Sequence, residues 1–326
     1  MLLYLKESEI ESLINYSEVM QICEDSYRAF EEETSLQEAY VMYFWEGFDP
    51  KRDPFTDCSI TQPCYSKFMK VAGVKTCHYF LSNPEKGLDV IQILVCLSDH
   101  ETGIPLSIMP GNFITQLRTS GNSAVAAKYL ARRGSSSIAI IGCGHQGKGH
   151  LLAMRELFDI KDIRIYDIRK EAMEKYRDEM GVRLNVDIKV SDNPKDAVKG
   201  ADIVCMVTTA AKPLVFEEWI ESGCFVSAVH GFSDFDIKFT KQADKFLIGE
   251  RRSDVNLLSS RFKEFSESDV NGTIGEIILD KKHGRTNDDE RTLFANPGIL
   301  SLPDMLIAST VYQRAMKKGM GMKLES

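Results

Sequence analysis

The sequence predicts an α/β protein with two parts, a doubly wound parallel sheet and a smaller α+β region. Three observations support this. From residue 137 onwards, short apolar strands alternate with helical segments, which is typical of repeated βαβ units. The first of these strands, SIAII at 137–141, runs into a glycine-rich turn that opens a helix. The residues before and after this region show other patterns, namely hairpin strands and a terminal amphipathic helix.

The segment ahead of residue 137 is expected to hold two amphipathic helices and an antiparallel sheet. Apolar residues recur at helical spacing over 8–33, and Ser17 is a candidate N-cap for the second helix. The run DVIQILVCLSD at 89–99 is joined to IPLSIMPG at 104–111 by the turn residues ETG. Two apolar runs separated by such a turn predict a β-hairpin.

The βαβ region contains further candidate strands. They are IRIYD (163–167), VDIKVSD (186–192), DIVCMVTTA (202–210), CFVSAVHG (224–231) and KFLIGE (245–250). PLVFEEWIESG at 213–223 is expected to supply the helix after the third of these. We therefore expect a parallel-sheet domain over residues 120–296, and a second domain built from 1–119 together with 297–326.

Composition and charge limit the classes of function. The chain has 326 residues and a formal net charge of -8, which argues against a general nucleic-acid binder, because such proteins need a basic surface. Acidic residues follow the N-terminal run MLLYL at once, and no stretch approaches the ~18 apolar residues of a membrane span. We therefore expect a soluble cytoplasmic protein that contacts neither nucleic acid nor membrane.

The cysteines and histidines do not form a metal-binding pattern. Eight cysteines occur without a C-x-x-C pair, and the six histidines show no H-x-x-x-H spacing. Several cysteines lie in apolar runs such as VCL and IVCMV, as core residues do. We expect reduced thiols in the core and no metal site.

Gly142, Gly144 and Gly147 have the G-x-G-x-x-G spacing directly after a strand and at the start of a helix. In Rossmann domains the first glycine allows a tight turn, the second lets a pyrophosphate approach the backbone, and the third lets helix and strand pack closely. The amides and the positive potential of the helix N-terminus then bind the phosphates. The parallel sheet is therefore predicted to be a Rossmann domain.

An acidic residue about 20 positions further on completes this pattern, because it binds the ribose hydroxyls. Asp167 stands there, at the end of IRIYD. Its charge would repel a 2′-phosphate, so NAD is favoured over NADP. Arg169 and Lys170 keep NADP open, since a basic side chain can bind a 2′-phosphate. A flavin, a nucleoside or a domain without cofactor are the other interpretations of the glycines.

Several segments resemble the ornithine cyclodeaminase/mu-crystallin family. They are AGVKT at 72–76, ITQLRTSGNSAVAAKYLARRG at 114–134, IGCGHQG at 141–147, the YD that ends IRIYD, and GRTNDDERTLFANPG at 284–298 with the following PD. The resemblance implies homodimers of two-domain subunits with bound NAD or NADP, in which the domain outside the Rossmann fold binds substrate and forms the dimer. It also implies hydride transfer at a carbon that bears nitrogen and, usually, a carboxylate.

The resemblance assigns substrate residues as well. Lys75 matches the family's substrate-binding lysine, which pairs with a carboxylate or moves a proton if burial lowers its pKa. Arg118 matches a second carboxylate partner, and a guanidinium can bind a carboxylate through two parallel hydrogen bonds. Thr119 follows at the expected domain junction, where a substrate would meet the cofactor, and is assigned to cofactor binding. Without the resemblance, Lys75 would be interpreted as a solvated lysine and Arg118 as an exposed arginine near a helix cap.

Other positions match residues that line the cofactor in this family. His145 and Gln146 lie in the phosphate loop, and Thr208 ends the strand DIVCMVT. Asn296 and Pro297 match the pair that closes over the nicotinamide and the substrate, with Asn296 assigned to the cofactor and Pro297 to the substrate.

One departure from the family concerns the residue that transfers protons. Cyclodeaminases carry an aspartate in a motif like G-x-D-x-P-G-K, whereas this chain has Phe232 at the aspartate position of HGFSDFDIK, 230–238. Asp234 and His230 are the candidates for an acid/base, and a neutral structural role for His230 is equally open. Reductases and dehydrogenases of the family also lack the aspartate, so the departure disfavours cyclodeamination.

The sequence therefore predicts an NAD-dependent oxidoreductase that interconverts an amino acid, or an N-substituted amino acid, with its imino or keto acid. Two alternatives stay open. One is ornithine cyclodeaminase, which forms proline and ammonia, and the other is a crystallin-like protein that binds a small ligand without catalysis. AYVMYFWEG at 39–47 has no basic residue where the family often has an arginine, so the substrate is left open.

Overall fold

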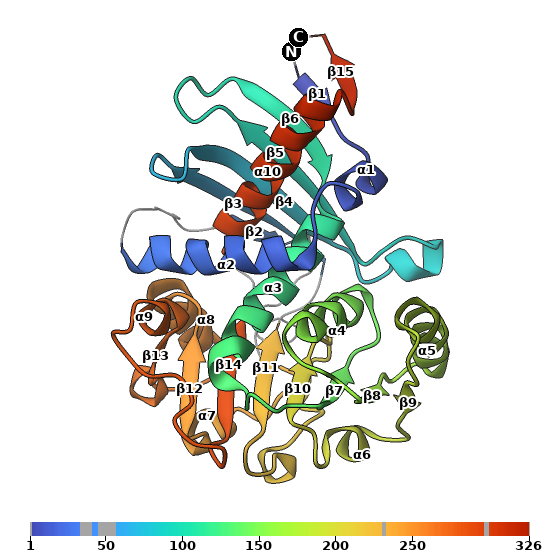
Figure 1. Ribbon diagram of the computed structural model, residues 1–326, viewed down its shortest axis with the longest axis vertical. Coiled ribbons are helices and arrows are strands. Elements are labelled where there is room, and N and C mark those ends of the chain that lie inside the picture. Colours follow the sequence, from blue (N-terminus) through green and yellow to red (C-terminus); the bar gives the residue numbers. More distant parts are fainter. Residues whose placement is uncertain (1, 33–40, 45–56, 230–232, 297–299, 326) are drawn as a thin grey trace. The chain divides into compact units, whose positions relative to one another are not determined.

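The computed structural model describes residues 2–32, 41–44, 57–229, 233–296 and 300–325, with the backbone alone at 41–44 and 296. The chain divides into two compact units (Figure 1), one of residues 1–118 with 299–326 and one of residues 119–298. The two ends of the chain therefore belong to the same unit. That the first unit binds substrate and the second binds cofactor stays a prediction.

The first unit is built on a sheet in the order β15-β1-β6-β5-β4-β3-β2. Its strands are β1 (Leu2–Tyr4), β2 (Val41–Phe44), β3 (Cys58–Ser66), β4 (Val71–Tyr79), β5 (Ile91–Ser98), β6 (Pro105–Pro110) and β15 (Met322–Leu324). Neighbours from β2 to β6 are antiparallel, and β1 pairs with β6 in parallel. The predicted hairpin is confirmed as β5 and β6.

Helices complete this unit. They are α1 (Glu7–Glu11), α2 (Tyr16–Glu31), α10 (Leu302–Lys318), the short 3₁₀ helix η1 (Asn83–Lys86), and α3 (Asn112–Leu130), which continues into the second unit. Helix α10 packs against α2 and against β3, β4 and β5 (Figure 1). Gly73 lies on β4, where a Cβ would come 2.4 Å from the backbone oxygen of Cys96 on β5 and 2.7 Å from the sulfur of Met305 on α10. The neighbouring strand above all leaves no room for a side chain at this position.

The N-cap predicted for the second helix is wrong. Asn15, not Ser17, caps α2: the Asn15 side chain accepts a hydrogen bond from the backbone N–H of Glu18 at 3.0 Å. The Glu18 carboxylate in turn accepts from the backbone N–H of Asn15. This reciprocal pair satisfies two amides of the first turn, so Ser17 falls inside the helix.

The second unit contains the predicted doubly wound parallel sheet, in the order β13-β12-β14-β11-β10-β7-β8-β9. Its strands are β7 (Ser137–Ile141), β8 (Asp162–Tyr166), β9 (Lys189–Val190), β10 (Ile203–Met206), β11 (Phe225–Val229), β12 (Lys245–Ile248), β13 (Gly272–Thr273) and β14 (Thr292–Asn296). The chain moves outward from β7 through β8 and β9, and then returns to β10 on the other side. Ligands of open α/β sheets bind at the carboxyl ends of the strands where the order reverses in this way.

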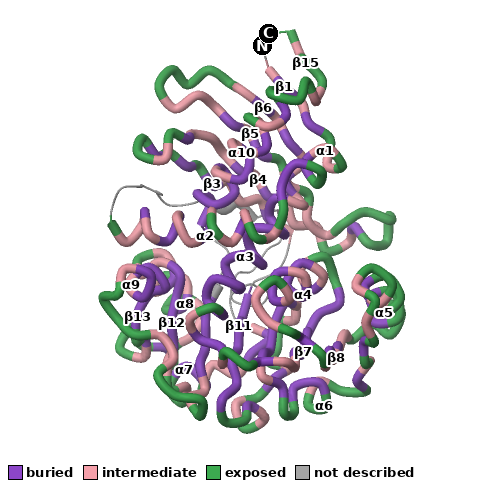
Figure 2. Tube along the Cα trace, viewed as in Figure 1, coloured by how far each residue is buried: buried purple, intermediate pink, exposed green. Residues whose placement is uncertain are grey.

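Both faces of this sheet are buried. Ala139 and Ile141 of β7 belong to one core cluster, while Ile138 and Ile140, which point to the opposite face, are also fully buried. Figure 2 shows β7 and β11 as buried strands. The helices of the unit are α4 (His145–Leu157), α5 (Lys170–Leu184), α6 (Pro194–Val198), α7 (Phe239–Gln242), α8 (Arg251–Arg261) and α9 (Ile274–Ile278), with the 3₁₀ turns η2 (Glu217–Trp219) and η3 (Glu267–Asp269).

One predicted helix, 213–223, does not form, and one strand lies out of sequence order. The stretch 213–223 forms only η2, because Val215 makes a parallel bridge with Phe235 and its backbone is therefore extended. Strand β14 lies between β11 and β12, so the strand order is not the sequence order on that side. Both features depend on pairing between residues far apart in the chain, which local patterns do not reveal.

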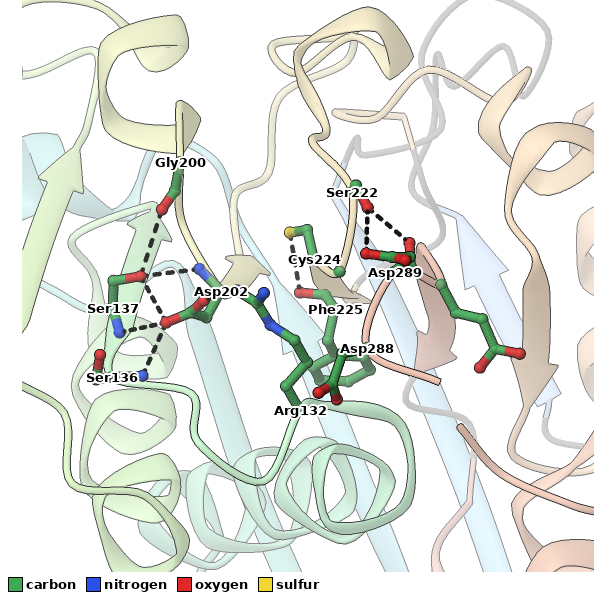
Figure 3. A network of polar contacts seen from close by, with 12 residues as sticks. Arg132, Ser136, Ser137, Gly200, Asp202, Ser222, Cys224, Phe225, Asp288 and Asp289 are labelled. Atoms are coloured by element: carbon green, nitrogen blue, oxygen red, sulfur yellow. Dashed lines mark hydrogen bonds and ion pairs between the residues drawn. The ribbon is translucent and has the colours of Figure 1, made fainter. Parts of the chain in front are cut away.

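The amino ends of β7 and β10 are joined by a polar network (Figure 3). The Asp202 carboxylate accepts hydrogen bonds from the backbone N–H groups of Ser136 and Ser137, at 2.8 and 3.0 Å. Arg132, just beyond α3, forms an ion pair with Asp202. The network holds together the amino ends of these two strands. Ligands of such sheets bind at the opposite, carboxyl ends.

Seven of the eight cysteines are buried, and none forms a disulfide. Cys96, in the run VCL, is half-exposed, because it points to the other face of the sheet from Val95 and Leu97. The expectation that this cysteine lies in the core is wrong. Among the described stretches of chain, no helix combines the length and apolarity that a membrane span requires.

Candidate active site

The loop between β7 and α4 holds the three glycines. Gly142 has a φ of 111°, in the left-handed region that favours glycine. A Cβ on Gly147 would lie 2.2 Å from the carbonyl oxygen of Gly142, whereas a Cβ on Gly144 would have no neighbour within 4 Å. The fold of the loop thus requires the first and third glycines, while the second leaves open space beside the backbone.

Helix α4 begins in this loop, with Gly144 at its N-cap and His145 as its first residue. Two hydrogen bonds hold the first turn in place. His150 Nδ1 donates to the carbonyl oxygen of Gln146 at 2.8 Å, and the Tyr176 hydroxyl donates to that of Gly147 at 3.0 Å. The amide end of the helix is therefore presented rigidly, which suits an anionic group.

The Asp167 carboxylate faces the same loop from the end of β8. Its Oδ2 accepts a hydrogen bond from the backbone N–H of Cys143, and its Oδ1 accepts from that of Arg169, both at 2.9 Å. Arg169 is largely exposed, with Nε 3.7 Å from Asp167 Oδ1. Glycine loop, helix terminus and fixed carboxylate together fit the pyrophosphate and the ribose hydroxyls of a dinucleotide.

Besides the glycine loop and Asp167, this unit contains a polar pair formed by Thr208 and Asp234. The Thr208 hydroxyl donates to Asp234 Oδ2 at 2.8 Å, and Leu214 N–H donates to the Asp234 carbonyl oxygen at 2.8 Å. Asp234 is almost fully buried, and this burial raises its pKa to about 6, although the hydrogen bonds from Thr208 oppose the rise. A carboxyl group with such a pKa can both accept and donate a proton near neutral pH.

The two predicted carboxylate-binding residues meet in the first unit, at an aspartate. Lys75 on β4 donates from Nζ to Asp304 Oδ2 at 2.7 Å, and Arg118 Nε lies 3.3 Å from the same oxygen. All three side chains are buried. Burial and the nearby Arg118 lower the pKa of Lys75, whereas Asp304 raises it. The cluster holds two cationic side chains and one anionic side chain.

Asp304 was not predicted as a site residue, although the sequence contains a signal that could have identified it. It lies on the same face of α10 as Ile307, Ala308 and Val311, at helical spacing, and all four are fully buried. An aspartate in the apolar stripe of an amphipathic helix is unusual, because charged side chains are rarely buried unless they are paired. The signal identifies the aspartate but not its partner.

The remaining predicted residues are placed as follows. Thr119 is buried on α3, next to Arg118. Asn296 ends β14, where its backbone pairs with Val229 of β11. His230 and Pro297 lie outside the described residues. No group of histidine, cysteine and acidic side chains that could hold a metal ion occurs in the residues that the structure covers.

Comparisons with known proteins identify the family. The chain is 32% identical to the alanine dehydrogenase of Archaeoglobus fulgidus, over 99% of this chain and 98% of the relative. Its fold matches the Thermococcus litoralis Δ1-pyrroline-2-carboxylate reductase in complex with NADH and L-proline, with a TM-score of 0.90, 28% identity and coverage of 99% and 100%. An archaeal alanine dehydrogenase dimer with bound NAD matches with a TM-score of 0.88, 30% identity and coverage of 99% of both chains. The sequence model of the ornithine cyclodeaminase/mu-crystallin family matches residues 3–319, and the chain belongs to this family.

Proposed function

We propose that this protein is an NAD-dependent oxidoreductase that interconverts an amino acid, or an N-substituted amino acid, with the corresponding imino or keto acid. The observation that carries the proposal is the buried cluster of Lys75 and Arg118, whose two positive charges are opposed by the single charge of Asp304. A carboxylate would balance the remaining charge. Alanine and pyrroline-2-carboxylate, named for the relatives, both carry a carboxylate on the carbon that bears nitrogen.

The cofactor residues follow from the loop geometry. The N-terminus of α4 and the glycine loop would bind the pyrophosphate, and Asp167 the adenosine ribose, of an NAD molecule that accepts or supplies the hydride. The fixed Asp167 carboxylate favours NAD, because a 2′-phosphate beside it would be repelled.

The other roles belong to the chain's own side chains. Arg118 Nε faces Asp304 at 3.3 Å, and the buried Nη1 of the same side chain has no hydrogen-bond acceptor among the described residues. The guanidinium therefore keeps a buried donor for a substrate carboxylate. Lys75 adds the second positive charge. Asp234, ionised, would accept a proton from the substrate nitrogen and, protonated, would return it. His230 stays a second candidate for this role.

We propose that the chain forms a homodimer through a sheet face of the first unit. On the face of its sheet opposite to Lys75, the register places Pro63, Val74, Cys96 and Ile108 in one row across four strands. In the adjacent rows Tyr65 and Leu94 are 47% and 40% exposed. An apolar sheet face of this kind marks a protein interface, and the matched alanine dehydrogenase is a dimer. A second copy of this chain is therefore the proposed occupant.

The experiment that tests the proposed activity is a substrate screen with two readouts. Amino acids are supplied with NAD, and keto acids plus amines, or cyclic imines, with NADH, while NADH absorbance and ammonia are followed together. A stoichiometric change in NADH with one substrate family supports the proposal. Ammonia and proline from ornithine without a net change in NADH contradict it in favour of cyclodeamination, and NADH binding without any turnover contradicts catalysis.

A further inference from the structure

We propose that Asp304 is a positioning residue that sets the charge and the orientation of the carboxylate-binding pair Lys75 and Arg118, so that the cluster accepts one carboxylate. The inference deepens the proposed function and rests on it. It assigns a role in substrate recognition to a residue of the C-terminal helix, which the sequence separates from Lys75 by 229 positions.

The geometry shows how Asp304 orients the pair. Lys75 and Asp304 both have side chains that are 0% exposed, and their contact is short at 2.7 Å. On the other carboxylate oxygen, Oδ1, Asp304 accepts a hydrogen bond from the Thr115 hydroxyl at 3.3 Å. One oxygen therefore lies between the lysine and the arginine, while the other is held by α3. This fixes the carboxylate plane and, through it, the ammonium group of Lys75.

The charges show why one aspartate is needed. An unpaired buried cation is strongly unfavourable, and two cations beside each other are more so. Asp304 offsets one of the two positive charges, and the cluster keeps a net charge of +1. A ligand with one carboxylate then neutralises the cluster. Without Asp304 the two adjacent cations would have no counter-charge, so the buried Lys75 would lose its proton more readily.

The other titratable groups around the cluster do not supply a negative charge. They are the thiols of Cys23 on α2, Cys64 on β3 and Cys77 on β4, each of which interacts electrostatically with Asp304. Burial raises the pKa of all three thiols, so they stay protonated at neutral pH. Among the described neighbours of Lys75, Asp304 is thus the counter-charge.

Removal of Asp304 has a defined consequence for Lys75. Burial and Arg118 both lower the pKa of Lys75, and Asp304 opposes them. In Asp304→Asn the opposing influence is lost, so Lys75 gives up its proton at lower pH and leaves Arg118 as the sole cation. Substrate binding then weakens at neutral pH and recovers as the pH falls, because Lys75 is protonated again.

The test measures KM and kcat for L-alanine and L-proline with NAD, across pH, in the wild type, Asp304→Asn and Asp254→Asn. Asp254 is an equally buried aspartate that caps the turn before α8, so its variant controls for loss of a buried carboxylate. We expect KM to rise about tenfold or more in Asp304→Asn, with a new pH dependence, and to stay unchanged in Asp254→Asn. An active wild type whose KM and pH profile survive Asp304→Asn would overturn the inference.

A second measurement does not depend on turnover. Asp304→Asn should lower the Tm, because the buried Lys75 amine loses the carboxylate that it contacts. In a cycle with Lys75→Met, the double variant Lys75→Met/Asp304→Asn should recover part of the loss. Strictly additive Tm changes would show that Lys75 and Asp304 are not coupled and would contradict the inference. If the wild type turns over no amino acid while the Tm changes are non-additive, the proposed function fails and the coupling of the pair stands.

Discussion

The side-chain hydroxyl of Thr208 donates a hydrogen bond to Oδ2 of Asp234 at 2.8 Å, and the Thr208 backbone N–H points to the same oxygen at 3.3 Å. Burial raises the pKa of Asp234 to about 6, and the two contacts from Thr208 oppose the rise because they favour the ionised carboxylate. The contacts from Thr208 therefore keep the pKa of Asp234 close enough to neutral pH for the carboxyl group to exchange protons.

This relationship predicts the pH dependence of amine oxidation. With Asp234 as the proposed base, amine oxidation would require its ionised form, so kcat/KM should rise with pH through a pKa near 6. In Thr208→Val the hydroxyl contact is lost, the pKa of Asp234 increases, and the rising limb moves to higher pH. Thr208→Ser, which keeps a hydroxyl, is the matched control. The measurement is the pH profile of kcat/KM.

Asp234→Asn tests the same role directly. The variant should lose the rising limb of the pH profile. Its kcat should also fall by about 100-fold or more, which is the usual contribution of a positioned base. Retention of a limb near the same pH would assign the proton transfer to another group, with His230 as the remaining candidate.

The glycines of the phosphate loop predict two different defects. In Gly147→Ala the new Cβ would lie 2.2 Å from the carbonyl oxygen of Gly142, so the loop must distort, and both the Tm and NADH affinity should fall. In Gly144→Ala the Cβ would enter open space, so the Tm should stay unchanged. NADH affinity should fall, because the methyl group would occupy the place proposed for the pyrophosphate. Thermal melting and NADH fluorescence titration check both. Full NADH affinity in Gly144→Ala would contradict binding at this loop.

The fixed carboxylate of Asp167 predicts cofactor preference. Asp167→Ala removes the proposed acceptor for the ribose hydroxyls and the proposed repulsion of a 2′-phosphate, while Arg169 stays. The ratio of kcat/KM for NAD to that for NADP should therefore fall by about tenfold or more. Glu171→Gln, which removes an exposed charge at the start of α5, should leave the ratio unchanged. An unaltered ratio in Asp167→Ala would exclude Asp167 from the ribose site.

Local signals were sufficient to predict the parallel sheet and its glycine loop. Each part of the loop lies within a few residues of the next, and the requirement for glycine at 142 and 147 arises from backbone geometry inside the loop itself. The position of the acidic residue, 167, follows from the combined length of the helix and the strand that separate it from the glycines. Sequence patterns therefore locate the dinucleotide site, although its residue roles stay predictions.

The partner of Lys75 could not be predicted in this way. Asp304 reaches Lys75 because α10 packs against β4, and no local pattern links positions that are 229 residues apart. The same holds for Val215, whose pairing with Phe235 replaces the helix that its own segment predicts. Contacts between distant segments decided both cases.

His150 predicts how stability depends on pH. Burial lowers its pKa from 6.5 to about 4, although its hydrogen bond to the Gln146 carbonyl opposes the change. Between these values the unfolded chain binds a proton that the folded chain does not, so stability is complete above pH 6.5 and is lost as the pH falls towards 4. The loss amounts to at most about 3 kcal/mol.

His150→Asn should abolish this contribution, so its Tm should fall less steeply than that of the wild type between these pH values. His283→Asn, at an exposed position, is the control and should follow the wild type. Thermal melts at a series of pH values give the slopes. Parallel slopes for the wild type and His150→Asn would show that His150 is charged in the folded protein.

The exposed sheet face of the first unit predicts the effect of a charge on assembly. Leu94 is 40% exposed on β5, and its neighbours in the register, Thr76 and Pro110, carry no charge. Leu94→Glu would place one carboxylate from each copy in an apolar interface, where an unpaired charge is costly, so the mass measured by light scattering should shift from dimer to monomer. Val182→Glu introduces the same charge at an apolar residue of α5 that is 85% exposed, and it should stay dimeric. A dimer that survives Leu94→Glu at low concentration, or a monomeric wild type, would show that this face is not the interface.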